Sequence, residues 1–258
     1  MDLRTLLIVC PLVFLAGFVD SVAGGGGIIS LPAYLMAGIP AHLAAGTNKV
    51  VNGSGTLIST VQYFRRGKVR LRPAAAAAAG ALAGSAAGAQ LASMISEAAL
   101  QTIMLCALPC VAVFLVLKKD FGRDGDAPAA PMDPRRETAV SAAIGLGVGC
   151  YDGLVGPGTG TFMIVCFTAF LSMDLLTASG CSKAANLASN LAAAVVWIAH
   201  GDVLWSLAPA AMACSILGNH LGARYAIRGG SKRVRSMMFV VLGLLFCKLL
   251  GDLLPGIG

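Results

Sequence analysis

Long apolar stretches separated by short polar breaks run along the whole chain. Most are about 20 residues long, the length that a helix needs to cross ~30 Å of hydrocarbon. None alternates with a period of two, which argues against β-strands. The pattern predicts an all-α polytopic membrane protein with apolar segments at 5–23, 27–38, 46–64, 73–93 and 97–117, then 137–155, 159–172, 179–199, 203–223 and 234–254.

The second half of the chain repeats the first. At an offset of 134 residues Lys49 meets Lys183 and Asn52 meets Asn186. Uncommon residues that recur at one offset indicate an internal repeat. The repeat also assigns residues 1–23 to the fold, although their apolar core followed by small residues resembles a secretory signal.

Charge at equivalent loops predicts that the two repeats have opposite orientations. The loop at 65–72 is strongly basic and its partner at 199–205 has no Lys or Arg, whereas 93–97 has none and its partner at 224–235 is basic. Basic loops mark the cytoplasmic side, so this pattern is typical of an inverted-topology repeat with both termini outside. The expected organisation is a first transmembrane repeat at 1–117, a cytoplasmic linker at 118–136 and an inverted second repeat at 137–258.

Composition excludes several other classes of protein. The chain is 57% apolar and 12% charged with mean hydropathy +0.81, whereas a soluble domain is roughly 25% charged. The net charge of +7 comes mainly from three basic clusters between apolar segments, which argues for a membrane and against nucleic acid. The cysteines form no CxxC pair, so neither a metal site nor a disulfide framework is indicated. The basic clusters are Arg65, Arg66, Lys68, Arg70 and Arg72; Lys118, Lys119, Arg123, Arg135 and Arg136; and Arg224, Arg228, Lys232, Arg233 and Arg235.

Glycine-rich breaks at 24–27 and 156–160 precede the two shortest apolar segments. Those segments either span the membrane or re-enter it. Inverted-repeat transporters bind substrate near the midplane, where broken helices expose their ends. Close helix packing is the alternative role for such glycines. The break residues that we expect to line a substrate site are Gly25, Gly26, Gly158 and Thr159.

Lys49 and Lys183 are the basic residues that lie outside the clusters and follow the paired glycine breaks. A lysine inside a membrane is costly and marks a functional site. Each lies near the start of its apolar segment, where a helix N-terminus favours an anion. Alternatively, the lysines snorkel to the interface or pair with a buried carboxylate.

Neutral polar residues accompany both lysines. Spacings of three and seven residues place each set on one helical face, where amides and hydroxyls can donate to an oxyanion. For the asparagines, hydrogen bonds that pack one helix on another compete with this role. The residues at these spacings are Asn52 and Thr56 in the first half and Asn186 and Asn190 in the second, and Asn48 and Ser182, which directly precede the lysines, are further candidates for substrate binding.

Asp20 and Asp152 are the matching acids, at an offset of 132, and each precedes a glycine break by four residues. A carboxyl group in a low-dielectric site can exchange protons near physiological pH, which makes both residues candidates for proton coupling. A structural ion pair with the lysines or a helix cap is the alternative.

The motifs at 17–32 and 45–49, with weaker echoes at 149–160 and 179–186, resemble the sulfite exporter TauE/SafE family along essentially the whole chain. The resemblance implies a secondary transporter of a small sulfur-containing anion, such as sulfite, sulfoacetate or another organosulfonate, in a bacterial inner membrane.

Other functions are compatible with parts of the sequence. A passive anion channel also accounts for the buried lysines. An intramembrane aspartyl protease is a remote alternative: Tyr151-Asp152 matches half of its motif pair, but the Gly-x-Gly-Asp half is missing. We therefore expect no enzyme activity, no cofactor and no metal, with an anion and the lipid bilayer as partners. The sequence leaves open the identity of the anion, the direction of transport, the coupling ion and the oligomeric state, a homodimer included.

Overall fold

The computed structural model describes residues 3–104, 106 and 132–253, with side chains of 242 and 244–253 left aside. All regular secondary structure in these residues is helical, which confirms the predicted all-α class. The helices are α1 (Leu3–Ala23), α2 (Gly27–Met36), α3 (Ala41–Arg65), α4 (Leu71–Ser93), α6 (Pro134–Leu154), α7 (Thr159–Leu171), α8 (Leu175–His200) and α9 (Ala208–Leu253).

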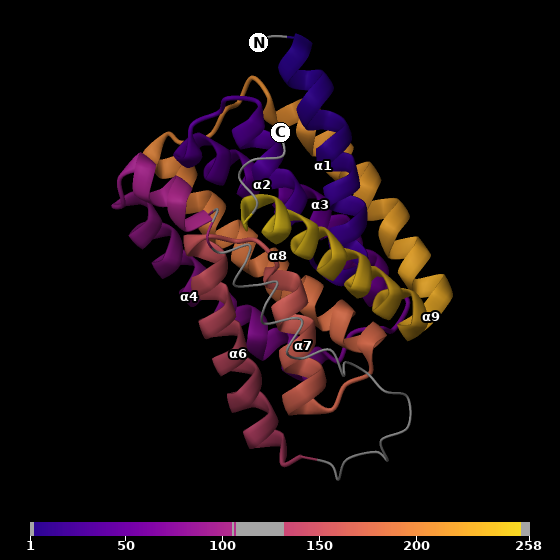
Figure 1. Ribbon diagram of the computed structural model, residues 1–258. Coiled ribbons are helices and arrows are strands. Elements are labelled where there is room, and N and C mark those ends of the chain that lie inside the picture. Colours follow the sequence, from indigo (N-terminus) through magenta and orange to yellow (C-terminus); the bar gives the residue numbers. More distant parts are fainter. Residues whose placement is uncertain (1–2, 105, 107–131, 254–258) are drawn as a thin grey trace.

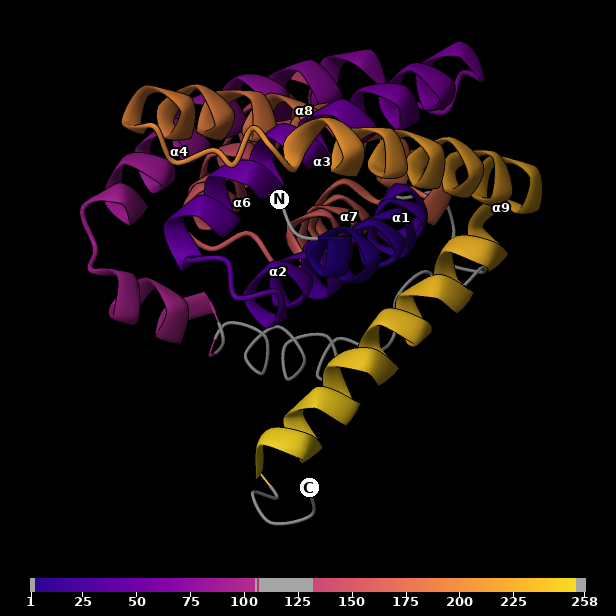
Figure 2. The same cartoon turned by 90° about the horizontal axis from the view of Figure 1, so that it is seen from above.

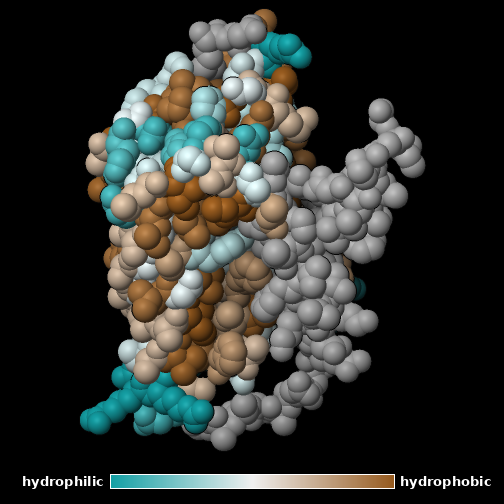
Figure 3. All heavy atoms as spheres, turned by 60° about the vertical axis from the view of Figure 1, so that its left-hand side comes forward, coloured by the Kyte–Doolittle hydropathy of each residue, from teal (hydrophilic) through white to brown (hydrophobic). Residues whose placement is uncertain are grey.

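The surface and the helix composition suit a lipid environment. Among the described helices, α1 and α4 are long and apolar enough to cross a membrane, and α2 and α7 are shorter apolar helices. The polar residues of α3 and α8 are mostly buried within the bundle. Figure 3 shows hydrophobic residues over the middle of the visible face and hydrophilic residues gathered toward its ends.

The helices follow the same order in both halves. A long helix is followed by a short one and then by two long ones, α1 to α4 in the first half and α6 to α9 in the second. In Figure 1, α1 begins at the top of the molecule and α6 begins at the bottom. The leading helices of the two halves therefore run in opposite directions.

The two halves interlock. The most extensive helix contacts join α4 to α6 and α1 to α9, and α3 packs against α8 in the centre. Each half thus places its first helix against a helix of the other half, α1 on α9 and α6 on α4 (Figures 1 and 2). This exchange brings residues from both halves to the α3–α8 contact, where the polar residues lie.

Glycines make the exchanged contacts possible. A Cβ atom added to Gly84 of α4 would lie 2.1 Å from the Leu146 carbonyl oxygen of α6, and one added to Gly218 of α9 would lie 2.1 Å from the Phe14 carbonyl oxygen of α1. Real Cβ atoms do not approach backbone so closely. Small residues in such positions let membrane helices pack backbone to backbone.

Carboxylates fix the starts of the two central helices, a local one at α8 and a distant one at α3. The Asp174 carboxylate accepts hydrogen bonds from the Leu176 and Thr177 N–H groups at the start of α8. Burial raises the pKa of Asp174, but hydrogen bonds from Thr177, Leu176 and Ser231 outweigh burial and leave it below its usual value. At the start of α3, Glu97 accepts from Ala41 N–H and contacts the His42 ring.

The chain departs from the predicted segments near its C-terminal end. The basic segment 224–235, expected to be a loop, is helical except at Gly230, where φ of 65° and ψ of −164° bend α9. The range Ala208–Leu253 given to α9 therefore holds two helices that meet at this kink, in line with the two segments predicted at 203–223 and 234–254, and the first of them begins at Ala208 after a turn. Most of the linker predicted at 118–136 lies outside the described residues.

Gly145 of α6 provides a test of the backbone contact between α4 and α6. An added Cβ would lie 2.0 Å from the Ala77 carbonyl oxygen, so Gly145→Ala should lower the free energy of unfolding by about 1–3 kcal/mol through overpacking. Gly147→Ala on the same helix is the matched control, because nothing lies within 4 Å of its added Cβ. Thermal unfolding in detergent measures both variants, and equal melting temperatures would contradict the close contact.

Candidate functional site

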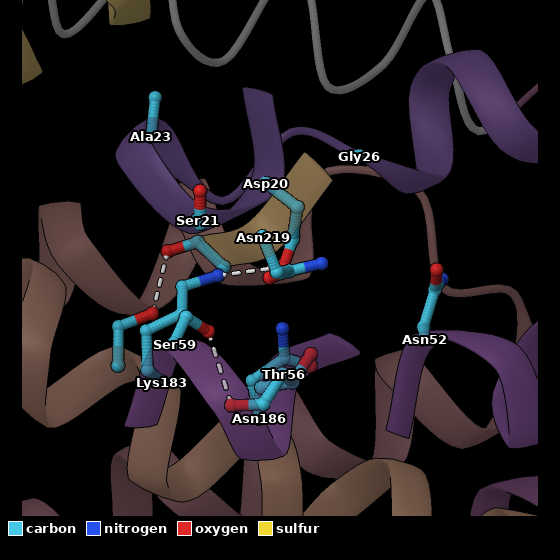
Figure 4. Close-up of polar contacts among 12 residues, drawn as sticks. Asp20, Ser21, Ala23, Gly26, Asn52, Thr56, Ser59, Lys183, Asn186 and Asn219 are labelled. Carbon is cyan, nitrogen blue, oxygen red and sulfur yellow. Dashed lines mark hydrogen bonds and ion pairs between the residues drawn. The ribbon is translucent and has the colours of Figure 1, made fainter. Parts of the chain in front are cut away.

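Two buried ion pairs occupy the centre of the molecule, and each joins a lysine of one half to an aspartate of the other. Lys49 of α3 lies 2.8 Å from an Asp152 carboxylate oxygen of α6, and Lys183 of α8 lies 2.8 Å from an Asp20 carboxylate oxygen of α1. Figure 4 shows Lys183 reaching from α8 to Asp20. Each pair joins one half of the chain to the other. The lysines therefore do not snorkel to an interface, and each has a buried carboxylate as its partner.

The glycine breaks place both aspartates. Asp20 and Asp152 lie in the last turn of α1 and of α6, and each helix ends where a glycine adopts a positive φ, +79° at Gly24 and +91° at Gly156. A side chain is disfavoured in this conformation. Without these turns the chain could not reverse directly after the carboxylates.

Hydroxyl and N–H groups of the protein donate hydrogen bonds to the backbone carbonyl oxygens that the glycine breaks leave without a helical partner. Thr161 donates its hydroxyl to the Ala23 carbonyl oxygen at 2.7 Å and its N–H to the Gly24 carbonyl oxygen at 3.3 Å. Ser182 donates to the Gly160 carbonyl oxygen at 3.0 Å. Lipid cannot make such bonds, so broken helices persist in a membrane only where protein or water supplies the partners.

The two breaks and the two central helices enclose a small polar cavity. Its volume is about 10 Å³, the space that one water molecule needs. Both halves contribute to it. Its lining residues are Asp20, Gly24, Gly27, Asn48, Lys49, Asn52, Asp152, Gly156, Thr159, Gly160, Asn186 and Asn190.

The asparagines pair within their helices and turn their remaining donors to the cavity. Asn52 donates to the Asn48 side-chain oxygen at 3.1 Å, and Asn190 donates to the Asn186 side-chain oxygen at 3.0 Å. The side-chain nitrogens of Asn48 and Asn186 have no hydrogen-bond partner among the described residues. These bonds lie along α3 and α8 and do not join one helix to another, so two amide groups remain available to a ligand.

Six of the predicted site residues lie outside this cavity. Lys183 is fully buried behind Asp20, and Ser182 is bonded to Gly160. Gly25 faces Val241, and Gly26 packs on the Asp20 side chain. The hydroxyl of Thr56 is buried without a partner among the described residues. Gly158 has a positive φ of 77° and begins α7.

Sequence reasoning missed Ser189, which donates a hydrogen bond to the second carboxylate oxygen of Asp152. Its repeat partner at an offset of 134 is Gly55, which has no side chain. A search for matching polar residues in the two halves could not find it. Gly24, Gly27, Gly156 and Gly160 were also missed as cavity-lining residues, although the breaks that contain them were predicted.

The chain matches the family described as Sulfite exporter TauE/SafE over residues 9–249. The chain belongs to the TauE/SafE family. This confirms the resemblance that the N-terminal motifs indicated, and it makes the protein a membrane transporter.

Three relatives of this TauE/SafE protein carry names that refer to transport. A probable membrane transporter protein ORF9 of Sinorhizobium sp. is 36% identical over 93% of this chain and 90% of its own. A probable membrane transporter protein of Haemophilus influenzae is 32% identical over 93% and 92%. The probable membrane transporter protein YfcA of Escherichia coli K12 is 30% identical over 92% and 87%. No solved structure matches the TauE/SafE chain.

The Lys183–Asp20 pair of this TauE/SafE protein should respond to substitution as a buried ion pair does. Lys183→Met leaves the Asp20 carboxylate without its cation, and breaking a buried pair destabilises by about 3–5 kcal/mol. The double variant Lys183→Met/Asp20→Asn removes both charges and should recover most of that loss. Apparent melting temperatures in detergent provide the comparison. A double variant no more stable than Lys183→Met would show that the two charges do not depend on each other.

Proposed function

We propose that this TauE/SafE transporter is a secondary carrier that binds a small sulfur-containing anion in the cavity between its halves. The cavity itself supports this proposal: it combines one lysine with four asparagines, and two of their amide nitrogens lack a protein partner among the described residues. Cationic and amide N–H groups are the donors that a sulfite or sulfonate oxygen accepts. The predicted inverted repeat places such a site near the membrane midplane.

Charge balance constrains how the anion binds. Lys49 and Lys183 each have a carboxylate partner, so the formal charge of the four residues sums to zero. An anion added to this arrangement would bring uncompensated negative charge into a low-dielectric site. It therefore replaces a carboxylate as a lysine partner, or it arrives with a proton. This is the physical basis for proton coupling through Asp20 or Asp152.

The cavity size favours a carrier over a passive channel. A space for about one water molecule is too small for sulfite or an organosulfonate, so the helices around it must move before such an anion can bind. Such a movement is what alternating access provides, in which one part of the protein rocks against the other around the site. A channel requires a continuous path instead.

We also propose an orientation in the membrane. The basic loop at 65–72 and the segment 118–136 would face the cytoplasm of a bacterial inner membrane, with both termini outside. Bacterial relatives support the choice of membrane. Cysteines introduced singly at residues 67 and 201 and labelled in whole cells would test which side each loop faces.

A thermal-shift screen tests anion binding. Sulfite, thiosulfate, sulfate, sulfoacetate, taurine and carboxylate analogues are added to the purified protein, and a ligand of the native state raises its melting temperature. Lys49→Ala should abolish the shift, since Lys49 is the cavity-lining lysine. Lys68→Ala, in the exposed loop after α3, is the control and should keep it. The same shift in Lys49→Ala as in the wild type would overturn the site.

Transport in proteoliposomes separates the carrier from the channel. A carrier coupled to protons accumulates the anion identified in the screen against its gradient when a pH gradient is imposed. Purely downhill flux that ignores pH would favour the channel.

A further inference from the structure

The two aspartates match in the repeat but differ in their hydrogen bonds. One carboxylate oxygen of Asp152 accepts from Lys49 at 2.8 Å and from the Thr159 hydroxyl at 2.8 Å, and the other accepts from the Ser189 hydroxyl. Both oxygens of Asp152 are therefore satisfied by protein donors. Its side chain is 4% exposed.

Asp20 lacks these side-chain donors. Its Oδ2 accepts from Lys183 at 2.8 Å, and its Oδ1 has no hydrogen-bond partner among the described residues. Gly27 and Gly55 occupy the repeat positions of Thr159 and Ser189, so neither hydroxyl has a counterpart. The Asp20 side chain is 11% exposed and lines the cavity.

This difference decides which carboxyl group can gain a proton. Hydrogen bonds donated to a carboxylate stabilise its charged form and oppose protonation. Asp152 has the Ser189 hydroxyl, and the Thr159 hydroxyl that it shares with the Gly156 carbonyl oxygen, in addition to its lysine, whereas Asp20 has only its lysine. We propose that Asp20, and not its repeat partner Asp152, takes up the proton that accompanies the anion. This inference rests on the proposed anion carrier and assigns its coupling residue.

The surroundings of Asp20 offer positions for water. The side-chain oxygens of Thr56 and Asn219 are buried without a partner among the described residues, and Figure 4 draws both residues around the Lys183–Asp20 pair. Buried polar atoms of this kind are where ordered water binds, and water can carry a proton. Their repeat counterparts, Asn190 and Ser85, are hydrogen-bonded.

The charged and titratable groups around Asp20 are consistent with this role. Lys183 of α8 is its ion-pair partner, Tyr63 of α3 lies near it, and Lys49 and Asp152 share the cavity. Helix α9 contributes the neutral amide of Asn219.

A proton on Asp20 restores the charge balance of the site. It removes one negative charge, and a singly charged anion supplies one in its place, so the formal charges of the four residues and the anion again sum to zero. The neutral carboxyl group also becomes a hydrogen-bond donor that faces the cavity. A carboxylate at the same place would repel the anion.

Proton uptake on anion binding tests this assignment. Thiosulfate and methanesulfonate are suitable probes, because their charge is constant near neutral pH. Either anion is added to the wild-type protein in weakly buffered detergent solution containing a pH-sensitive dye, and binding is measured in parallel by thermal shift. We expect about one proton to be taken up for each singly charged anion bound. Binding without proton uptake would overturn the assignment, whereas no binding of any screened anion would contradict the proposed function.

Paired substitutions then locate the proton. Asp20→Asn should lose the proton uptake, and Asp152→Asn should keep it wherever the variant still binds anion. Thr159→Val/Ser189→Ala removes the hydroxyl donors of Asp152 and should add a second protonation step to the pH dependence of binding, while Thr159→Ser keeps the wild-type profile. Proton uptake retained in Asp20→Asn and lost in Asp152→Asn would reverse the roles. If Asp20→Asn does not fold, the wild-type proton count and the profile of Thr159→Val/Ser189→Ala decide the question.

Discussion

The structure depends on keeping four charges neutral in a low-dielectric interior. A buried lysine or carboxylate without a partner is strongly unfavourable. Here each lysine finds its partner on the other half of the chain, Lys49 with Asp152 and Lys183 with Asp20. The two halves therefore cannot move apart without leaving charges unpaired. The packing of α1 on α9 and of α4 on α6 helps to keep these charges paired, because it brings the carboxylates of α1 and α6 to the lysines of the central helices α8 and α3.

The glycines make this electrostatic arrangement sterically possible. Turns with positive φ at Gly24 and Gly156 let the chain reverse directly after each aspartate. The reversals abut closely: a Cβ atom on Gly24 would lie 2.2 Å from the Gly160 carbonyl carbon. Side chains at these positions would push the two breaks apart and open the cavity. The small size of the site is thus a consequence of backbone packing as much as of its polar lining.

Sequence reasoning predicted the parts of the site but not their pairing. The repeat identified Lys49, Lys183 and both aspartates, because a matched pair of rare residues stands out in an apolar chain. It could not say which lysine meets which carboxylate, since that depends on how the halves interlock. It also placed Lys183 in the substrate site, whereas the structure buries this residue behind Asp20. The helical conformation of most of 224–235 was missed because a basic segment with two glycines has the composition of a loop.

The helices follow one order in the two halves, and departures from this correspondence carry information about chemistry. A symmetric pair of sites would bind the same ligand twice, once from each side, with no reason for one acid to differ from the other. Ser189 and Thr159 break this symmetry on one side, and Gly55 and Gly27 leave the other side without hydroxyl donors. Asp152, the partner of Lys49, therefore has hydroxyl contacts that Asp20 lacks. In the proposed carrier, Asp152 stays the partner of Lys49 while Asp20 takes up the proton that keeps the site neutral. An inverted repeat that kept strict symmetry in its polar residues would have no such division between a fixed and an exchangeable charge.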